Sequence, residues 1–95
     1  MKRAIIIDSK DNVASLLSFV NNGDKVQANL GDDIFEFEIK ESIRFGHKFA
    51  TKQITMGENI IKYGEIIGRA TSDIDQGCHV HVHNVESLRG RGDLT

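Results

Sequence analysis

Glycines at one recurring spacing constrain this chain more than any other feature. Each stands midway between two apolar residues, one three positions before it and one three positions after it. The four copies are Val20-Gly23-Val26, Ile43-Gly46-Phe49, Ile54-Gly57-Ile60 and Ile74-Gly77-Val80. Because the intervals between copies are uneven, we interpret the four copies as the same type of turn used repeatedly rather than as an ancestral duplication. Glycine tolerates positive φ and the chain has no proline, so the pattern predicts tight turns in a small, mostly β, loop-rich fold.

One segment predicts a short helix. Asp11 is a suitable N-cap, and the apolar residues after it follow helical spacing, which would place them on one face. These residues are Val13, Leu16, Leu17 and Val20. Asn21-Asn22-Gly23 would then end the helix. We expect the helix to pack across one side of the strands.

The rest of the chain is predicted to form short strands. Phe35, Phe37 and Ile39 alternate with charged residues, a period typical of a half-buried strand. Further strands are expected at residues 5–7, 52–55, 65–70 and 79–84. Glu41, just after the first of these patterns, is interpreted as part of an exposed polar face.

Size and charge exclude several classes of protein. Ninety-five residues allow one domain, residues 1–95, with residues 84–95 as a flexible tail. A net charge of −2 argues against a nucleic-acid partner, and a single cysteine excludes an internal disulfide. The initial apolar run ends at Asp8, too soon for a signal peptide, and no stretch approaches a membrane span. We therefore expect a cytoplasmic protein without a membrane partner.

The densest chemical signal is a run of alternating histidines. On a strand, His79, His81 and His83 would share one face, while Val80 and Val82 would face the core. Neighbouring histidines of the run would stand about 6.5–7 Å apart, so two of them can bind one metal ion together with ligands from elsewhere. The same imidazoles and the following asparagine can instead hydrogen-bond a carboxylate or hydroxyl, or form a solvated polar face. Cys78 would lie on the Val80 side as a buried, unreactive thiol.

Two polar turns add basic candidates. His47 and Lys48 follow Gly46, and Lys62 precedes Tyr63 in the second turn. A lysine near a site can bind a carboxylate, or serve as a general base if it is desolvated. The alternative for each lysine is an ordinary solvated surface charge.

Several blocks together resemble one known family. They are Asp11-Asn12-Val13-Ala14, Gly46-His47-Lys48-x-Ala50, Lys62-Tyr63-Gly64 and Gly77-x-His79-Val80-His81-Val82-His83-Asn84, in this order. Over residues 11–84 the chain closely resembles the small N-terminal SAF domain of the altronate/galactarate dehydratase family. The resemblance implies a SAF-type β-clip fold.

The resemblance also implies an activity and a partner. Such enzymes are hydroxy-acid lyases, which remove the proton next to a carboxylate and expel water or sulfite from the β carbon. A divalent metal, commonly iron or manganese, can stabilise the charge that develops. The catalytic part is a large domain or subunit. Because that large part would supply the base and most ligands, we expect the chain to be inactive alone. The end of this chain resembles that of stand-alone small subunits such as those of sulfolactate sulfo-lyase.

The resemblance places the site residues on the histidine run and the two basic turns. It implies catalytic roles for His81 and His83, and metal ligation by His79 and His81. The implied substrate-binding residues are His47, Lys48, Lys62 and Asn84. The substrate, the metal, a homo-oligomeric state and the choice between a natural small subunit and an excised domain stay open.

Two other functions compete with this reading. SAF domains also serve as non-catalytic ligand- or partner-binding modules, for which the histidine block is not expected. A metal carrier would need tight binding by the chain alone, which a few histidines without carboxylates do not favour.

Overall fold

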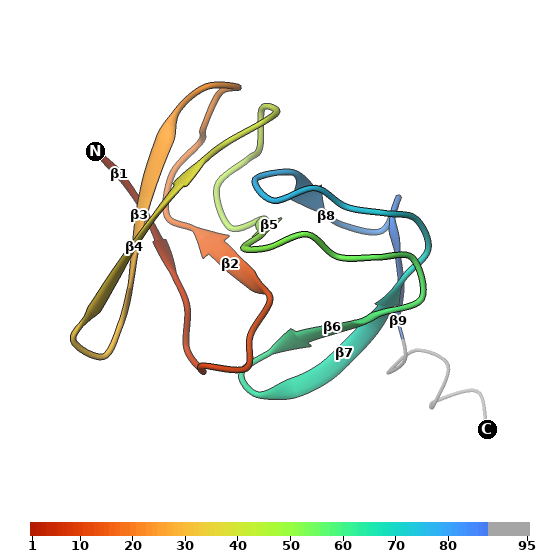
Figure 1. Cartoon of the computed structure of the whole chain (residues 1–95). Helices are drawn as coiled ribbons and strands as arrows, with labels where there is room; N and C mark the ends of the chain where they lie inside the picture. The colour runs from red at the N-terminus through yellow and green to blue at the C-terminus, as the bar shows by residue number, and fades with distance from the viewer. Residues whose placement is uncertain (88–95) are drawn as a thin grey trace.

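A computed structural model describes residues 1–87, and their fold is built from strands (Figure 1). In chain order they are β1 (Lys2–Ile5), β2 (Val13–Leu16), β3 (Lys25–Leu30), β4 (Asp33–Glu38), β5 (Lys48–Ala50), β6 (Asn59–Lys62), β7 (Glu65–Ala70), β8 (His79–Val80) and β9 (Val85–Ser87). The mostly β prediction is confirmed. Within the described residues, no helix is long and apolar enough to cross a membrane.

The strands form two sheets (Figure 1). The larger sheet has the order β4-β3-β1-β2-β5-β8, and the smaller one has the order β6-β7-β9. Neighbours are antiparallel except for β1 and β3, which are parallel. Strands β5 and β8 therefore end the larger sheet, and β2, the neighbour of β5, contacts β6 of the smaller sheet.

The predicted glycine turns are confirmed in all four copies. Gly23, Gly46, Gly57 and Gly77 have φ of 93°, 82°, 91° and 89°. Each glycine N–H donates to the carbonyl of a residue on or beside another strand. The N–H of that same residue donates to the carbonyl of the residue that follows the glycine, as in the pair formed by Leu16 with Gly46 and His47. All eight flanking apolar residues are at most 2% exposed. The repeat is thus one hydrogen-bonded turn built four times.

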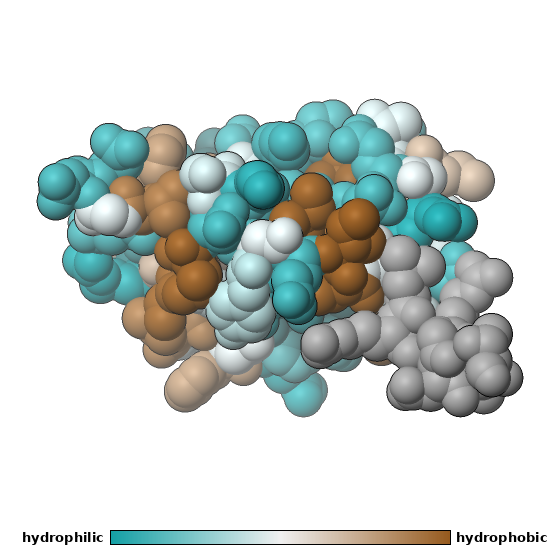
Figure 2. Space-filling model, turned by 90° about the horizontal axis from the view of Figure 1, so that it is seen from below, coloured by the Kyte–Doolittle hydropathy of each residue, from teal (hydrophilic) through white to brown (hydrophobic). Residues whose placement is uncertain are grey.

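Two apolar cores lie on different sides of β2. The first includes Leu16, Phe37 and Phe49. The rings of Phe37 and Phe49 meet edge to face, with their centroids 5.4 Å apart. The second includes Val13 and Val80 and joins the two sheets. On the face seen in Figure 2, side chains at the surface that are apolar gather in two areas separated by more hydrophilic ones.

The helix predicted after Asp11 is wrong. Residues Val13–Leu16 form β2, which pairs with β1 on one side and with β5 on the other. Val13 belongs to the second core, whereas Leu16 and Val20 belong to the first. The helical spacing arose because one strand supplies both cores and then enters the Gly23 turn. Two neighbouring strands satisfy the backbone groups that a helix would have satisfied internally.

The predicted histidine strand is shorter than expected. Strand β8 ends at Val80, and residues 81–84 turn, with the Asn84 N–H donating to the His81 carbonyl at 3.0 Å. Val80 is buried as predicted, but Val82 is 81% exposed and does not face the core. Alternation therefore stops where the strand stops.

The other strand predictions vary in accuracy. The strand at residues 65–70 is confirmed as β7, and the Phe35–Phe37 alternation lies in β4. The first strand is Lys2–Ile5 instead of residues 5–7, and residues 52–55 contribute only a single bridge between Ile54 and Ile74. Residues 85–87, expected in the tail, form β9 and pair with β7. The remainder of the predicted tail, residues 88–95, lies outside the described residues.

Candidate functional site

The site begins with the pairing of β5 and β8. In this antiparallel pair Phe49 lies opposite His79, and Lys48 lies opposite Val80. Continued by one residue, this register places His47 opposite His81 and diagonal to His79, on the same face. The Nδ1 atom of His47 and the Nε2 atom of His79 are 2.9 Å apart.

The turn after β8 brings two more imidazoles to the same place. The His81 ring lies 4.5 Å from the His47 ring and 5.3 Å from the His79 ring, measured between centroids. The His83 ring lies 5.2 Å from that of His79. All four histidines of the chain therefore gather in one cluster, in which His47 comes from a different turn than the other three.

Three of the four histidines are placed to share one ion. Ligand nitrogens of His47, His79 and His81 all lie within 4.8 Å of one another. A metal bound by imidazoles at 2.0–2.1 Å with tetrahedral angles needs nitrogens about 3.3 Å apart, a value between the 2.9 Å contact and that outer limit. The donor set fits a divalent transition metal. The predicted ligands His79 and His81 both belong to this group, and His47 joins them, whereas His83 does not.

Electrostatics favour the neutral, metal-binding form of His79 and His81. Burial lowers the pKa of His79, and the neighbouring histidines His83, His47 and His81 lower it further, against an opposing effect of Glu41. The pKa of His81 is also lowered, by partial burial and then by His47, Lys48 and His83. A ring that stays neutral keeps a lone pair for a metal or a proton.

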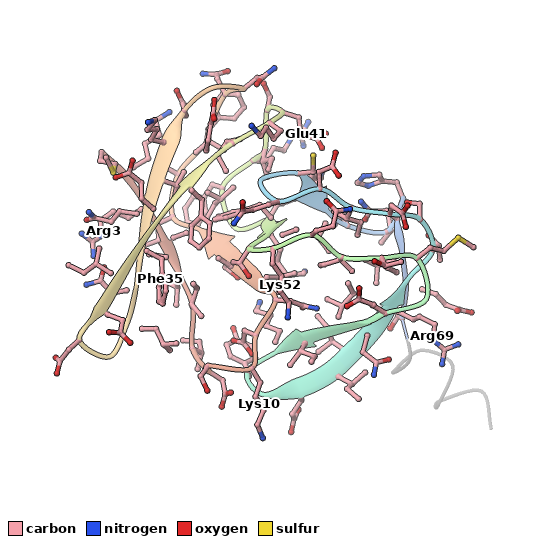
Figure 3. The ribbon with its side chains drawn as sticks, in the orientation of Figure 1. Arg3, Lys10, Phe35, Glu41, Lys52 and Arg69 are labelled. Atoms are coloured by element: carbon pink, nitrogen blue, oxygen red, sulfur yellow. The ribbon has the colours of Figure 1, made fainter. Side chains whose placement is uncertain are left out.

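Glu41 takes part in the site, although its sequence pattern indicated only an exposed polar face. It lies in the segment between β4 and β5 (Figure 3). Its Oε2 accepts the backbone N–H of His79 at 3.0 Å. Glu41 therefore fixes the start of β8 and supplies a negative charge beside the imidazoles.

Asn84 holds the turn that presents the histidines. Its Oδ1 accepts the His81 N–H at 2.9 Å, and its Nδ2 donates to the His79 carbonyl at 2.8 Å. The side chain is buried. Both ends of the amide are thus engaged with the backbone, and the predicted substrate contact by Asn84 stays a prediction.

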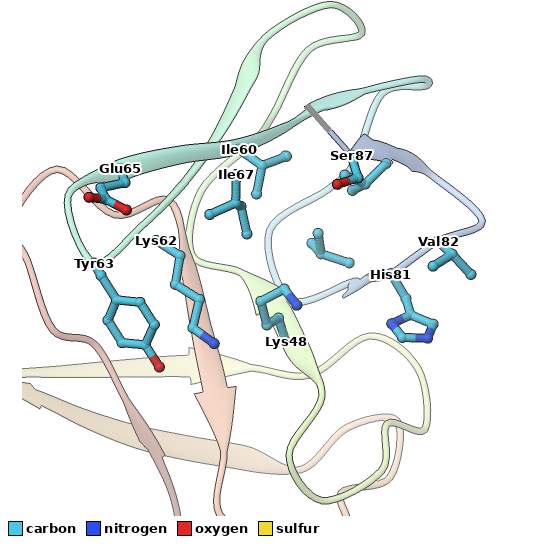
Figure 4. A pocket seen from close by; sticks show the side chains of 11 residues that line it. Lys48, Ile60, Lys62, Tyr63, Glu65, Ile67, His81, Val82 and Ser87 are labelled. Atoms are coloured by element: carbon cyan, nitrogen blue, oxygen red, sulfur yellow. The ribbon is translucent and has the colours of Figure 1, made fainter. Parts of the chain in front are cut away.

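A pocket of about 470 Å³ lies beside the cluster, between β5–β8 and the smaller sheet (Figure 4). Its polar lining consists of Lys48, Lys62, Tyr63, Glu65, His81 and Ser87, so two lysines and His81 face a single carboxylate. Its apolar wall consists of Ile60, Ile67, Val80, Val82 and Val85. His81 belongs to both the pocket and the imidazole group, so the two form one continuous site.

The two pocket lysines come from different sheets. Lys48 starts β5 and Lys62 ends β6. Burial lowers the pKa of Lys48, and the positive charge of Lys62 lowers it further. Two cations that disfavour each other in a partly buried pocket favour an anion between them. The structure thus brings together the predicted residues His47, Lys48 and Lys62.

His47 was predicted to bind substrate, and its position in the repeat is a signal that could have placed it with the metal ligands His79 and His81. The residue after the glycine is acidic in two turns, where Asp24 and Glu58 each accept a backbone N–H within their own turn. In the other two turns the same position holds His47 and Cys78. Burial and nearby acids raise the pKa of Cys78, as expected for an unreactive thiol. The two turns without the acidic residue are the two that flank the site.

The two small sheets and the glycine turns form the β-clip-like fold expected of a SAF domain. The model of the family described as altronate/galactarate dehydratase SAF domain matches residues 2–88. The chain therefore belongs to this family, as its resemblance over residues 11–84 predicted.

Similar proteins carry two names. The chain is 40% identical over 87 residues to altronate dehydratase of Bacillus subtilis (strain 168), a match that covers 92% of this chain and 17% of that protein. It is 47% identical over 58 residues to (2R)-sulfolactate sulfo-lyase subunit alpha of Chromohalobacter salexigens, covering 61% of this chain and 62% of that subunit. The same-named subunit of Paracoccus pantotrophus is 42% identical over 55 residues, covering 58% of this chain and 82% of that subunit. The chain thus spans less than two thirds of the first two relatives, and their names associate its domain with lyases.

Proposed function

We propose that this chain is the small SAF component of a hydroxy-acid lyase. It would act with a large catalytic subunit or domain on a small acid, by removal of the α proton and elimination of a β group. The observation that carries this proposal is the continuity of three imidazoles with a pocket that contains two lysines. The three imidazoles can bind a metal or a proton, and the two lysines can bind a carboxylate.

The residues divide the chemistry between them. Lys48 and Lys62 would bind the substrate carboxylate and compensate its charge when the neighbouring carbon loses its proton. His81 would contact a substrate oxygen, since it lines the pocket and belongs to the imidazole group. His83 lies outside the three-nitrogen group beside His79, so we assign it a role in proton transfer.

His47, His79 and His81 would hold a divalent ion such as iron or manganese. The ion would supply Lewis-acid stabilisation of negative charge on a substrate oxygen. Three imidazoles leave coordination positions free, which a substrate oxygen or a group of the partner could occupy.

We also propose, by analogy with its relatives, that this chain needs a partner subunit or domain. Two relatives are named as subunit alpha, and the altronate dehydratase relative is several times longer than the matched region. We expect the partner to contribute the remaining catalytic groups, and we expect the complex to act in the cytoplasm.

Affinity purification of the chain from its native cells tests the partnership. A stoichiometric large polypeptide should co-elute, and the complex should consume altronate, galactarate or (2R)-sulfolactate. His81→Ala and His83→Ala should each abolish turnover without loss of folding. Lys10→Ala, an exposed change on the loop between β1 and β2, is the control that should leave turnover intact (Figure 3). Full turnover in both histidine variants would overturn the site assignment, and a chain that elutes alone and leaves all three acids unchanged would overturn the function.

A further inference from the structure

Asn12 joins the two sheets through its backbone and its side chain. It is 2% exposed and directly precedes β2. Its carbonyl accepts the Thr51 N–H at 2.9 Å, just after β5, and its own N–H donates to the Ile61 carbonyl at 3.2 Å in β6. Its side chain accepts the Ile61 N–H and donates to the Asn59 carbonyl, both at 2.8 Å. One residue therefore fixes β6 relative to the end of β5.

Asp11 fixes the turn that follows β6. Its Oδ1 accepts the Gly64 N–H at 2.9 Å, and its Oδ2 accepts the Asp8 N–H at 3.1 Å. The turn needs positive φ at both central residues, and Tyr63 adopts 57° and Gly64 73°. A Cβ on Gly64 would lie 2.9 Å from the Asp8 carboxylate, so the turn lies close against this loop.

The contacts of Asp11 and Asn12 lie close in sequence to both pocket lysines. Lys48 begins β5, three residues before Thr51, and Lys62 lies between Ile61 and the turn held by Asp11. Figure 4 shows the two lysines entering the pocket region from separate strands. In residues 1–87, Asp11 and Asn12 supply hydrogen bonds to the backbone on both sides of Lys62.

We propose that Asp11 and Asn12 are positioning residues that set the location of Lys62 relative to Lys48, and so the spacing of the two cations offered to a bound acid. The proposal rests on the function proposed above for the pocket. It differs from ordinary turn capping, because Asp24 and Glu58 each accept an N–H only three residues away, whereas Asp11 reaches a turn 53 residues along the chain.

The test uses the full 95-residue chain and two simple probes. Succinate offers two carboxylates and acetate offers one, and NMR titration of the labelled chain gives both affinities. The unaltered chain should prefer succinate. Asp11→Ala should reduce succinate affinity about tenfold, because displacement of Lys62 weakens one of the two lysine contacts to the ligand, and should change acetate affinity much less. Asp11→Asn keeps one acceptor oxygen, so its succinate affinity should lie between that of Asp11→Ala and that of the unaltered chain.

Asp24→Ala is the matched control, because it also removes a carboxylate that caps a backbone N–H. It should lower thermal stability without changing either affinity. Amide hydrogen exchange at Gly64 supplies a readout that needs no ligand, and it should accelerate in Asp11→Ala and stay unchanged in Asp24→Ala.

The outcomes separate the two proposals. If the unaltered chain binds neither succinate nor acetate while Gly64 exchange accelerates in Asp11→Ala, the pocket assignment fails and the positional role of Asp11 stands. If Asp11→Ala matches the unaltered chain in both succinate affinity and Gly64 exchange, the positioning role is overturned. An equal loss of succinate affinity in Asp24→Ala would overturn it too, because general stability would then explain the effect.

Discussion

The side-chain amide of Asn84 bonds the backbone of His81 in the turn that presents the histidine cluster, with its Oδ1 2.9 Å from the His81 nitrogen. The same amide donates to the carbonyl of His79, so both ends of the histidine turn depend on one buried side chain. The arrangement of the imidazoles is therefore set by a neighbour that carries no charge.

Asn84→Ala should loosen this turn and weaken the site together with the fold. Loss of both hydrogen bonds leaves two backbone groups unsatisfied, and we expect the free energy of unfolding to fall by about 1–3 kcal/mol. Denaturant unfolding measures this loss, and zinc titration of the folded variant should show weaker binding than in the unaltered chain. Asn84→Asp keeps the acceptor for His81 and should be less damaging to the turn. Unchanged zinc affinity in Asn84→Ala would show that the turn does not need this amide.

The imidazole group predicts which histidines determine metal affinity. His47→Ala, His79→Ala and His81→Ala should each lower the affinity for zinc or cobalt by at least about tenfold, because three-ligand binding falls to two. His83→Ala should bind as the unaltered chain does, since its ring lies outside the group. Calorimetric titration gives the affinities, and the cobalt absorption spectrum reports the ligand geometry. A His83→Ala variant that loses as much affinity as His47→Ala would contradict this assignment.

The sequence predicted the turns better than it predicted the segments between them. Each of the four glycines has a positive φ and buried apolar neighbours, because local backbone geometry alone decides that requirement. The spacing of Val13 and Leu16 was misleading, because a strand that serves two cores can imitate the period of a helix. Local spacing cannot show which core a residue will join.

Part of the site also depended on tertiary structure. The histidine run was recognisable in the sequence, but alternation placed Val82 in the core, whereas the turn exposes it. The place of His47 in the metal group follows from the pairing of β5 with β8, a long-range contact that no local pattern encodes. The role of Asn84 in holding the turn likewise depends on a bend that the alternating pattern does not predict.

Gly77 and Gly57 should respond differently to the same substitution. Both have φ near 90°, so alanine is strained at either position by about 1–2 kcal/mol. Space around Gly57 is open, whereas a Cβ on Gly77 would collide with the carbonyl oxygen of Glu38. Gly77→Ala should therefore lower the free energy of unfolding by clearly more than Gly57→Ala. Equal losses in denaturant unfolding would mean that the backbone of Glu38 moves aside without cost.

Asp24 should make stability depend on pH in the acid range. The N–H of Asn21, and then Lys2, lower the pKa of Asp24 below its ordinary value. Because the folded pKa lies below the unfolded one, this carboxylate stabilises the fold above the unfolded pKa of about 3.9, and the contribution is lost as the pH falls through the folded pKa. Asp24→Asn should therefore lower the melting temperature at neutral pH, and its difference from the unaltered chain should shrink as the solution is acidified at low ionic strength. Lys2→Ala, which removes only the weaker cause, should reproduce a smaller part of this effect. A difference between Asp24→Asn and the unaltered chain that stays constant from neutral to acid pH would show that the carboxylate charge is not what stabilises this turn.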